Sequence, residues 1–259
     1  MLLAYWTYNE LTAPLTIAAA INSGKVEAQI SANGDSGGSV TITLTRPSGA
    51  SGTVKIVIPS GTPLYGTDPD GQRLITAVPV VVVLSDDTPS VTQHVQTFCI
   101  DEFAATPFNN APLAFVPPEN GSTTTTEETE PLHKLADCMA SVSQSDEDKQ
   151  LAVWAVSSDW LHKTREGAIQ FVTNGLAQRM AKERHDQLES KKSDLMRMAP
   201  SLSSDRIDEL IEAEYQNGMS DLNNMASTKA NEQVTSFIED DKDLLETCGY
   251  ATSDMAIFQ

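Results

Sequence analysis

The sequence has few cysteines, few basic residues and no long apolar run, and each scarcity excludes a class of protein. Its three cysteines among 259 residues are too few for a disulfide-stapled miniprotein, and no two have metal-ligand spacing. The 17 Lys and Arg face 36 Asp and Glu, so the net charge of −19 repels nucleic acid and anionic lipid. No stretch approaches the roughly 18 apolar residues of a membrane span. We therefore expect neither a nucleic-acid partner nor a membrane span.

Familiar catalytic motifs are missing as well. The four histidines lie far apart, without HExxH or HxH spacing, and no Gly-x-Ser-x-Gly elbow, Walker loop or GxGxxG is present. Carboxylate pairs such as Asp86-Asp87 fall in loops or on polar helix faces. We therefore expect a protein that is not an enzyme and holds no metal or cofactor. A hydrolase or metal enzyme whose site is assembled from scattered residues stays an alternative.

The N-terminal part has the alternation of β-strands. Runs rich in β-branched residues at 26–30, 40–44 and 54–58 are separated by Gly, Pro and Ser clusters, and further strands are expected at 74–78, 80–84 and 91–100. The uninterrupted valines at 80–83 predict a strand that is covered on both faces. This pattern predicts an antiparallel β-sandwich over residues 1–115.

A polar stretch then separates the strands from a helical part. Residues 116–131 are rich in Thr and Glu and predict a linker or surface loop. From Leu132 the apolar residues follow a helical period, and a charged helix is expected at 163–198. Pro200-Ser201 ends it, Ser203 or Ser204 caps the next helix, and another helix is expected at 220–239. Residues 132–259 therefore form the expected α-helical region, packed on the sandwich through 151–160. The fold class is α+β.

One thiol and one amide stand out from this background. Cys99 lies where the strand of 91–100 ends, and Gln150 heads the apolar run Leu151-Ala152-Val153-Trp154. In a dry pocket a thiol can displace ammonia from a Gln side chain and leave an internal thioester, with Phe98, Trp154 and Trp160 as candidate walls against water. The alternative is structural: Cys99 is a buried small residue or a disulfide partner of Cys138, and 151–156 is a core helix.

The segments Phe98-Cys99-Ile100-Asp101 and Lys149-Gln150-Leu151-Ala152-Val153-Trp154-Ala155-Val156 resemble the thioester domains of bacterial surface adhesins. The resemblance covers these two short motifs and their order. It implies a β-rich domain with a helical part, extracellular display, and covalent capture of an amine on a host or neighbouring surface. In that family's pattern Cys99 would supply the sulfur and Gln150 the acyl group.

Three functions follow as expectations. The first is a secreted or cell-surface protein for adhesion, which binds a protein partner or a surface amine through the thioester. The second is a non-covalent structural subunit of a surface layer or filament, which assembles as a homo-oligomer, and the third is the scattered-site enzyme. The first residues lack the basic and apolar regions of a signal peptide. We therefore expect either a cytoplasmic protein or a chain whose leader has been removed.

Overall fold

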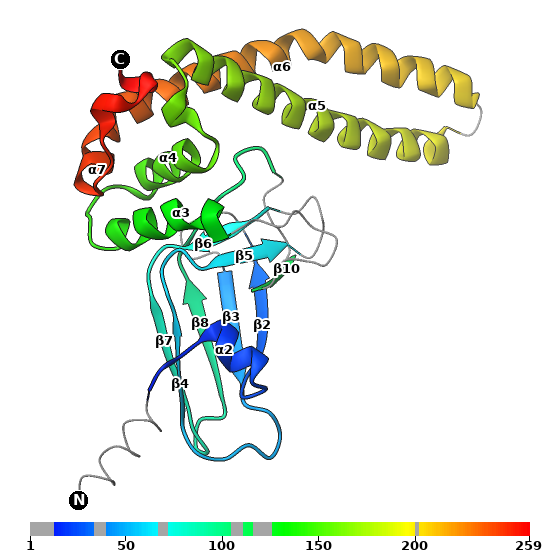
Figure 1. Cartoon of the computed structure of the whole chain (residues 1–259). Coiled ribbons are helices and arrows are strands. Elements are labelled where there is room, and N and C mark those ends of the chain that lie inside the picture. Colours follow the sequence, from blue (N-terminus) through cyan, green and yellow to red (C-terminus); the bar gives the residue numbers. More distant parts are fainter. Residues whose placement is uncertain (1–12, 34–39, 67–71, 105–110, 116–125, 200–201) are drawn as a thin grey trace, which may run out of the picture. The chain divides into compact units, whose positions relative to one another are not determined.

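The computed structural model describes residues 13–33, 40–66, 72–104, 111–115, 126–199 and 202–259. It has two β-sheets in the N-terminal part and long helices in the C-terminal part, so the α+β class is confirmed (Figure 1). The chain divides into two compact units. The first comprises residues 1–159 and 243–251, and the second comprises 160–242 and 252–259. The boundaries predicted from the sequence lie at 115 and 131 instead.

The strands of the first unit form two sheets. A three-stranded sheet has the order β1-β4-β7, in which β1 and β4 are parallel and β4 and β7 antiparallel. A curled antiparallel sheet has the order β8-β3-β2-β10-β5-β6-β9. The bounds are β1 Leu15–Thr16, β2 Glu27–Ala32, β3 Val40–Thr45, β4 Val54–Ile58, β5 Pro63–Gly66, β6 Leu74–Thr76, β7 Val80–Leu84, β8 Ser90–Val95, β9 Thr97–Cys99 and β10 Ala111–Ala114.

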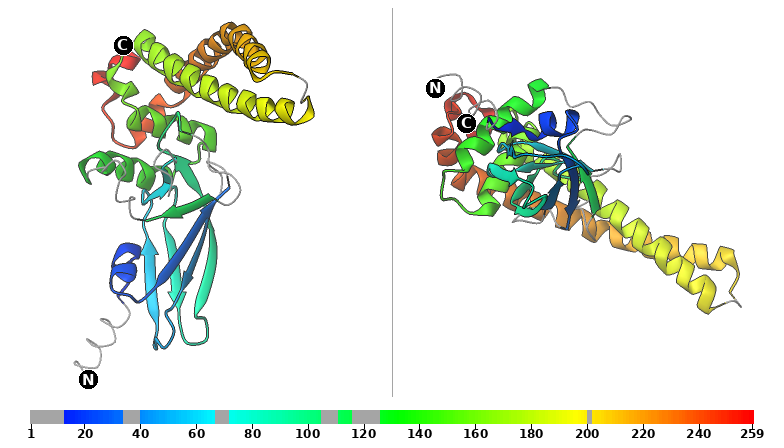
Figure 2. Two further views of the ribbon diagram at one scale, coloured as in Figure 1. Left: turned by 90° about the vertical axis from the view of Figure 1, so that its right-hand side faces the viewer. Right: turned by 90° about the horizontal axis from the view of Figure 1, so that it is seen from below.

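One apolar core joins the two sheets. It contains Ile56, Val82 and Leu84 from the small sheet and Ile42, Leu44, Leu64 and Leu74 from the large one, all at most 3% exposed. Cys99 belongs to the same cluster. The short helix α2 (Ile17–Asn22) contributes Ile17 and Ala20 and lies beside the strand layers (Figure 2). This shared core makes the first unit a sandwich.

Three helices complete the first unit at one end of the strands. Helix α3 (Thr126–Met139) buries Leu132, Leu135 and Met139, the face that the sequence predicts. Helix α4 (Asp146–Ser157) packs beside α3 and β9, and α7 (Lys242–Thr247) contributes buried Leu244 and Leu245. Residues 126–131 of the expected linker are thus the first turns of α3, while 116–125 lie outside the described residues.

The second unit is built on an antiparallel helical hairpin. Helix α5 (Arg165–Met198) and helix α6 (Ser204–Asp240) pack along each other, and the 3₁₀ turns η1 (Trp160–His162), η2 (Thr252–Asp254) and η3 (Ala256–Phe258) complete it. Ser203 is the N-cap of α6, and its hydroxyl accepts a hydrogen bond from the Arg206 N–H, as its place after Pro200 predicts. The sequence suggested two helices between 203 and 239, whereas α6 is continuous.

Two strand predictions are wrong in part. Val81 and Val83 are 54% and 48% exposed, because nothing in the described chain covers the outer face of the small sheet. The strand expected at 91–100 is two strands. Only Gln96 separates β8 from β9, yet these strands occupy opposite edges of the large sheet, so the sheet curls until its edges approach each other.

Candidate functional site

Helix α4 begins with a strong cap and runs beside β9. The Ser145 hydroxyl accepts a hydrogen bond from the Asp148 N–H, and Asp146, Glu147 and Asp148 place negative charge at the positive end of the helix. One turn later the helix becomes apolar, with Leu151, Ala152, Val153 and Ala155 buried. Gln150 is the polar residue at this boundary, 9% exposed. The cap therefore fixes which face of α4 carries Gln150.

The carboxamide of Gln150 hydrogen-bonds to both backbone groups of Cys99, 51 residues earlier in the chain. Its Oε1 accepts from the Cys99 N–H at 2.9 Å, and its Nε2 donates to the Cys99 carbonyl oxygen at 2.9 Å. Strand β9 is a sheet edge, so these backbone groups face away from β6. The amide thus replaces a neighbouring strand for one residue, and the two sequence-predicted residues lie in contact.

Two further hydrogen bonds hold α4 against the same edge. Gln96 Nε2 donates to Asp146 Oδ1 at 2.7 Å, and the Ser157 hydroxyl donates to the Ile100 carbonyl oxygen at 2.8 Å. Residues 146, 150 and 157 lie on one helix face because their spacings are close to whole turns. Gln96, Asp146 and Ser157 were not among the site residues predicted from the sequence. Their helical spacing from Gln150 was the available signal for the two on α4.

The segment after Cys99 is fixed from the opposite side by Arg73. The Asp101 carboxylate accepts hydrogen bonds from the Arg73 backbone N–H at 2.9 Å and from its guanidinium, and Ile100 N–H donates to the Arg73 carbonyl oxygen at 2.9 Å. Gln72 Nε2 adds a bond to the Asp101 carbonyl oxygen at 2.9 Å. Cys99 therefore sits in backbone that is held on both sides, which limits how far it can move from Gln150.

The three aromatic residues expected to exclude water have different surroundings. Trp154 packs against the core cluster that contains Cys99. Phe98 is 1% exposed, but neighbouring residues of a strand point to opposite faces, so its ring and the Cys99 thiol leave β9 in opposite directions. Trp160 belongs to the second unit, where its ring lies edge-to-face with Phe237 at 5.7 Å between centroids. Burial of Cys99, at 1% exposed, rests on the core cluster and Trp154.

The disulfide in the structure joins Cys138 at the end of α3 to Cys248 after α7. Cys99 takes no part in it, so the alternative of a Cys99–Cys138 bond is wrong. The Cys138–Cys248 bond spans 110 residues and joins the two parts of the first unit that are separated in sequence by residues 160–242. Cys99 is a buried cysteine that takes no part in a disulfide.

Ser60, Asp137 and His133 lie together, but their hydrogen bonds are not those of a nucleophilic serine. The Ser60 hydroxyl donates to the Asp137 carboxylate, and His133 Nδ1 bonds to the Ser60 carbonyl oxygen at 3.2 Å. A nucleophilic serine needs its hydroxyl hydrogen-bonded to the histidine that acts as general base. Gly61, at φ +71°, allows the loop to approach α3, since a Cβ there would lie 2.7 Å from the His133 Cα. These contacts attach α3 to the sandwich.

No group of three or more metal-ligating side chains is found in the part of the chain that the structure describes. No helix among the described residues is long and apolar enough to cross a membrane. Comparison with protein-family models, curated proteins and solved structures gives no match to this chain. Function is therefore argued from the Cys99–Gln150 contact and from its surroundings.

Proposed function

We propose that this protein is an extracellular or cell-surface binding protein whose Cys99 and Gln150 form an internal thioester that captures amines. The Cys99 sulfur attacks Cδ of Gln150, the C–N bond breaks, and the thiol proton leaves with the amide nitrogen as ammonia. A primary amine then attacks the same carbon, forms an amide and returns the Cys99 thiol. The observation that carries the proposal is the paired hydrogen bond between the Gln150 carboxamide and the Cys99 backbone.

Burial and rigidity both support this chemistry. A stored thioester must be kept from water, and Cys99 is 1% and Gln150 9% exposed. Reaction between two groups in one molecule is fast when they are held close together, and the bonds at Gln96, Ser157 and Arg73 restrict both partners. The order of the two motifs in the resemblance to adhesin thioester domains agrees with these roles.

The disulfide supports the proposed location. Disulfides persist in oxidising environments such as the cell exterior and are rare in the cytosol. Cys138 and Cys248 are bonded. An adhesive role also suits an acidic protein that meets amine-bearing surfaces, because opposite charge accelerates encounter.

Intact mass spectrometry of the native protein tests the bond. The wild-type chain should be lighter than its sequence mass by one ammonia, in addition to the two hydrogens of the disulfide. Methylamine should convert the thioester to the methylamide adduct and make one thiol accessible to alkylation after unfolding. Peptide mapping should place the adduct on Gln150.

Two variants control this experiment. Cys99→Ala removes the nucleophile, and Gln150→Asn keeps a carboxamide but shortens the side chain by one methylene. Both should have the full mass apart from the disulfide hydrogens and should not react with methylamine. A wild-type protein with the full mass would refute the thioester, and ammonia loss that persists in Cys99→Ala would assign it to another site.

The α5–α6 hairpin favours a second candidate function, a non-covalent assembly subunit. Helix α5 carries seven Lys or Arg against five Asp or Glu, whereas α6 carries two against nine. Met198 and Met225 are 78% and 58% exposed along these helices. Two copies that paired α5 with α6 of the other would match opposite charges and cover apolar surface.

Sedimentation velocity tests this assembly. If the hairpin mediates it, the sedimentation coefficient should rise with protein concentration and fall at high salt, and Met225→Lys should abolish the rise. A monomer at all concentrations and salt levels would reject the assembly. The thioester does not depend on this result, because Cys99 and Gln150 both belong to the first unit.

A further inference from the structure

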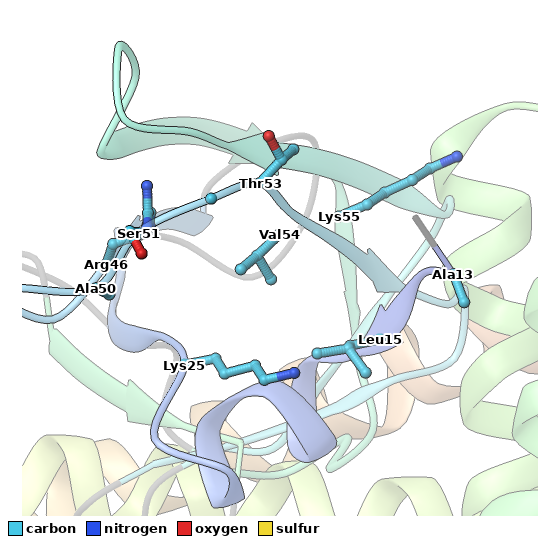
Figure 3. Close-up of a pocket in the computed structure, with 10 residues that line it drawn as sticks. Ala13, Leu15, Lys25, Arg46, Ala50, Ser51, Thr53, Val54 and Lys55 are labelled. Atoms are coloured by element: carbon cyan, nitrogen blue, oxygen red, sulfur yellow. The ribbon is translucent and has the colours of Figure 1, made fainter. Parts of the chain in front are cut away.

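The first unit contains a pocket that is separate from Cys99. Its volume is about 330 Å³, and its wall is formed by the residues before β1, the turn before β2, and the β3–β4 connection with the start of β4. In Figure 3, Lys25 extends beneath Val54 toward Leu15, and Lys55 leaves β4 on the other side of Val54. Strand β4 begins at this pocket, while Ser60, just after its other end, contacts α3.

The pocket gathers cations in a chain that has few. Lys25, Arg46 and Lys55 all line it, out of 17 Lys and Arg in a protein of net charge −19. They come from three separate elements, the turn after α2, the end of β3, and β4. Ser51 and Thr53 add hydroxyl groups, and Leu15 and Val54 add apolar surface. Such a lining suits an anionic group on a small organic body.

Arg46 is the strongest evidence for a ligand. Its side chain is only 3% exposed, and Nη1 donates to Asp86 Oδ1 at 2.7 Å. Its Nε and Nη2 are buried, with no hydrogen-bond partner among the described residues. Leaving charged donors unsatisfied in a protein interior is costly, so they are usually paired. A planar guanidinium with two unused donors is the group that best binds an oxyanion.

Asp86 is the natural competitor for such an anion. Its carboxylate is 65% exposed and accepts hydrogen bonds from Arg46 and from the Gly52 N–H at 3.2 Å. The hydrogen bond from Arg46 holds the pKa of Asp86 below its usual value. At neutral pH Asp86 therefore pairs with Nη1 of the guanidinium, and Nε and Nη2 keep no partner among the described residues.

We propose that this pocket binds the oxyanion head of a small acidic molecule, a carboxylate or a sulfate or phosphate ester, through Arg46 and Lys25. The occupant's oxygens would accept from the Arg46 donors that the chain leaves unsatisfied. The apolar residues Leu15 and Val54 would contact its body. This site does not depend on the proposed thioester, and a Cys99→Ala protein should retain it.

Titrations with sodium acetate and with sodium sulfate test the proposal. Sodium chloride keeps the ionic strength constant, and ¹⁵N NMR follows the Arg46 Nε and Gly52 N–H signals. Both signals should shift and saturate, and the anion that binds more tightly identifies the head group. Lys25→Gln should weaken binding by about two- to fivefold, whereas Lys55→Gln, whose side chain leaves the opposite face of β4, should change it less. Lys229→Gln, an exposed lysine on α6, is the matched control and should change nothing.

Asp86→Asn gives the sharper test, because it predicts a gain. Asparagine keeps an oxygen for Arg46 Nη1 but removes the competing charge, so anion affinity should rise by about two- to fivefold. Shifts that grow linearly without saturation would overturn the proposal, as would equal effects of Lys229→Gln and Lys25→Gln. Unchanged or weaker binding in Asp86→Asn would show that Arg46 is not the anion ligand and would overturn it as well.

Discussion

Replacing Gln150 with leucine should lower the stability of the folded protein, whether or not the thioester forms. The change removes both hydrogen bonds to the Cys99 backbone while keeping a side chain of similar size. Each intramolecular hydrogen bond contributes about 1 kcal/mol net, and a buried group left unsatisfied costs about 1–3 kcal/mol. Cys99 is 1% exposed, so water cannot replace the amide without rearrangement. We expect the free energy of unfolding to fall by about 2–4 kcal/mol.

The measurement is made in a Cys99→Ala background. Alanine keeps the N–H and C=O that bond to Gln150, and it removes any covalent link that would add to stability. Urea unfolding of Cys99→Ala and of Cys99→Ala with Gln150→Leu gives the difference from the midpoints at equal slope. Gln93→Leu, on exposed β8 in the same unit, is the control and should change stability by about 0.5 kcal/mol or less. Equal losses in the two leucine variants would refute the role of Gln150 as the partner of the β9 edge.

Three further predictions concern the surroundings of this site. Trp154→Phe removes a buried indole N–H that lies one turn from Gln150 and has no acceptor among the described residues. If this donor assists the reaction, intact mass should show that the fraction of purified protein that has lost ammonia falls several-fold. An unchanged fraction excludes that role. The double variant Cys138→Ser/Cys248→Ser should lower the unfolding free energy by about 2–5 kcal/mol in urea titrations, and a loss below 1 kcal/mol would contradict the bond's constraint on the unfolded chain. Burial raises the pKa of Tyr250 from 10.0 to about 12, so ultraviolet titration should show a late ionisation step that is missing in Tyr250→Phe. Because the folded protein favours the neutral phenol, the contribution of Tyr250 to the free energy of unfolding is present below pH 10.0 and is lost as the pH rises toward 12. Tyr250→Phe should abolish this loss.

Local sequence patterns predicted the bounds of the strands better than they predicted what packs against each strand. The bounds of β4 and β7 agree with the runs at 54–58 and 80–84, because β-branched residues between Gly and Pro clusters define strands locally. The exposure of Val81 and Val83 was not predictable in this way, since the number of covered faces depends on what packs against the small sheet. Pro112 in β10 likewise concealed a strand that pairs with β2 and β5.

The candidate site was predictable from chemistry and not from periodicity. An amide heading an apolar helix and a cysteine at a strand end suggested a pair, but their contact depends on β9 being a sheet edge. That position follows from the break at Gln96, which no local pattern indicates. With three cysteines the sequence also left the disulfide open, and the packing of α3 against the chain after α7 decides it for Cys138 and Cys248.

The hydrogen bonds at Cys99 give a physical reason why the proposed thioester would favour amines over water. Forming the thioester keeps the carbonyl oxygen that accepts from the Cys99 N–H but removes the N–H that donates to the Cys99 carbonyl oxygen. Attack by a primary amine returns an amide N–H, so the lost bond can form again. Attack by water leaves a buried carboxylate: one oxygen can still accept from the Cys99 N–H, but the other takes the place of the amide nitrogen and faces the Cys99 carbonyl oxygen, which is unfavourable in a poorly solvated site. The backbone of Cys99 thus stabilises the amide product and destabilises the hydrolysed one, without any catalytic side chain.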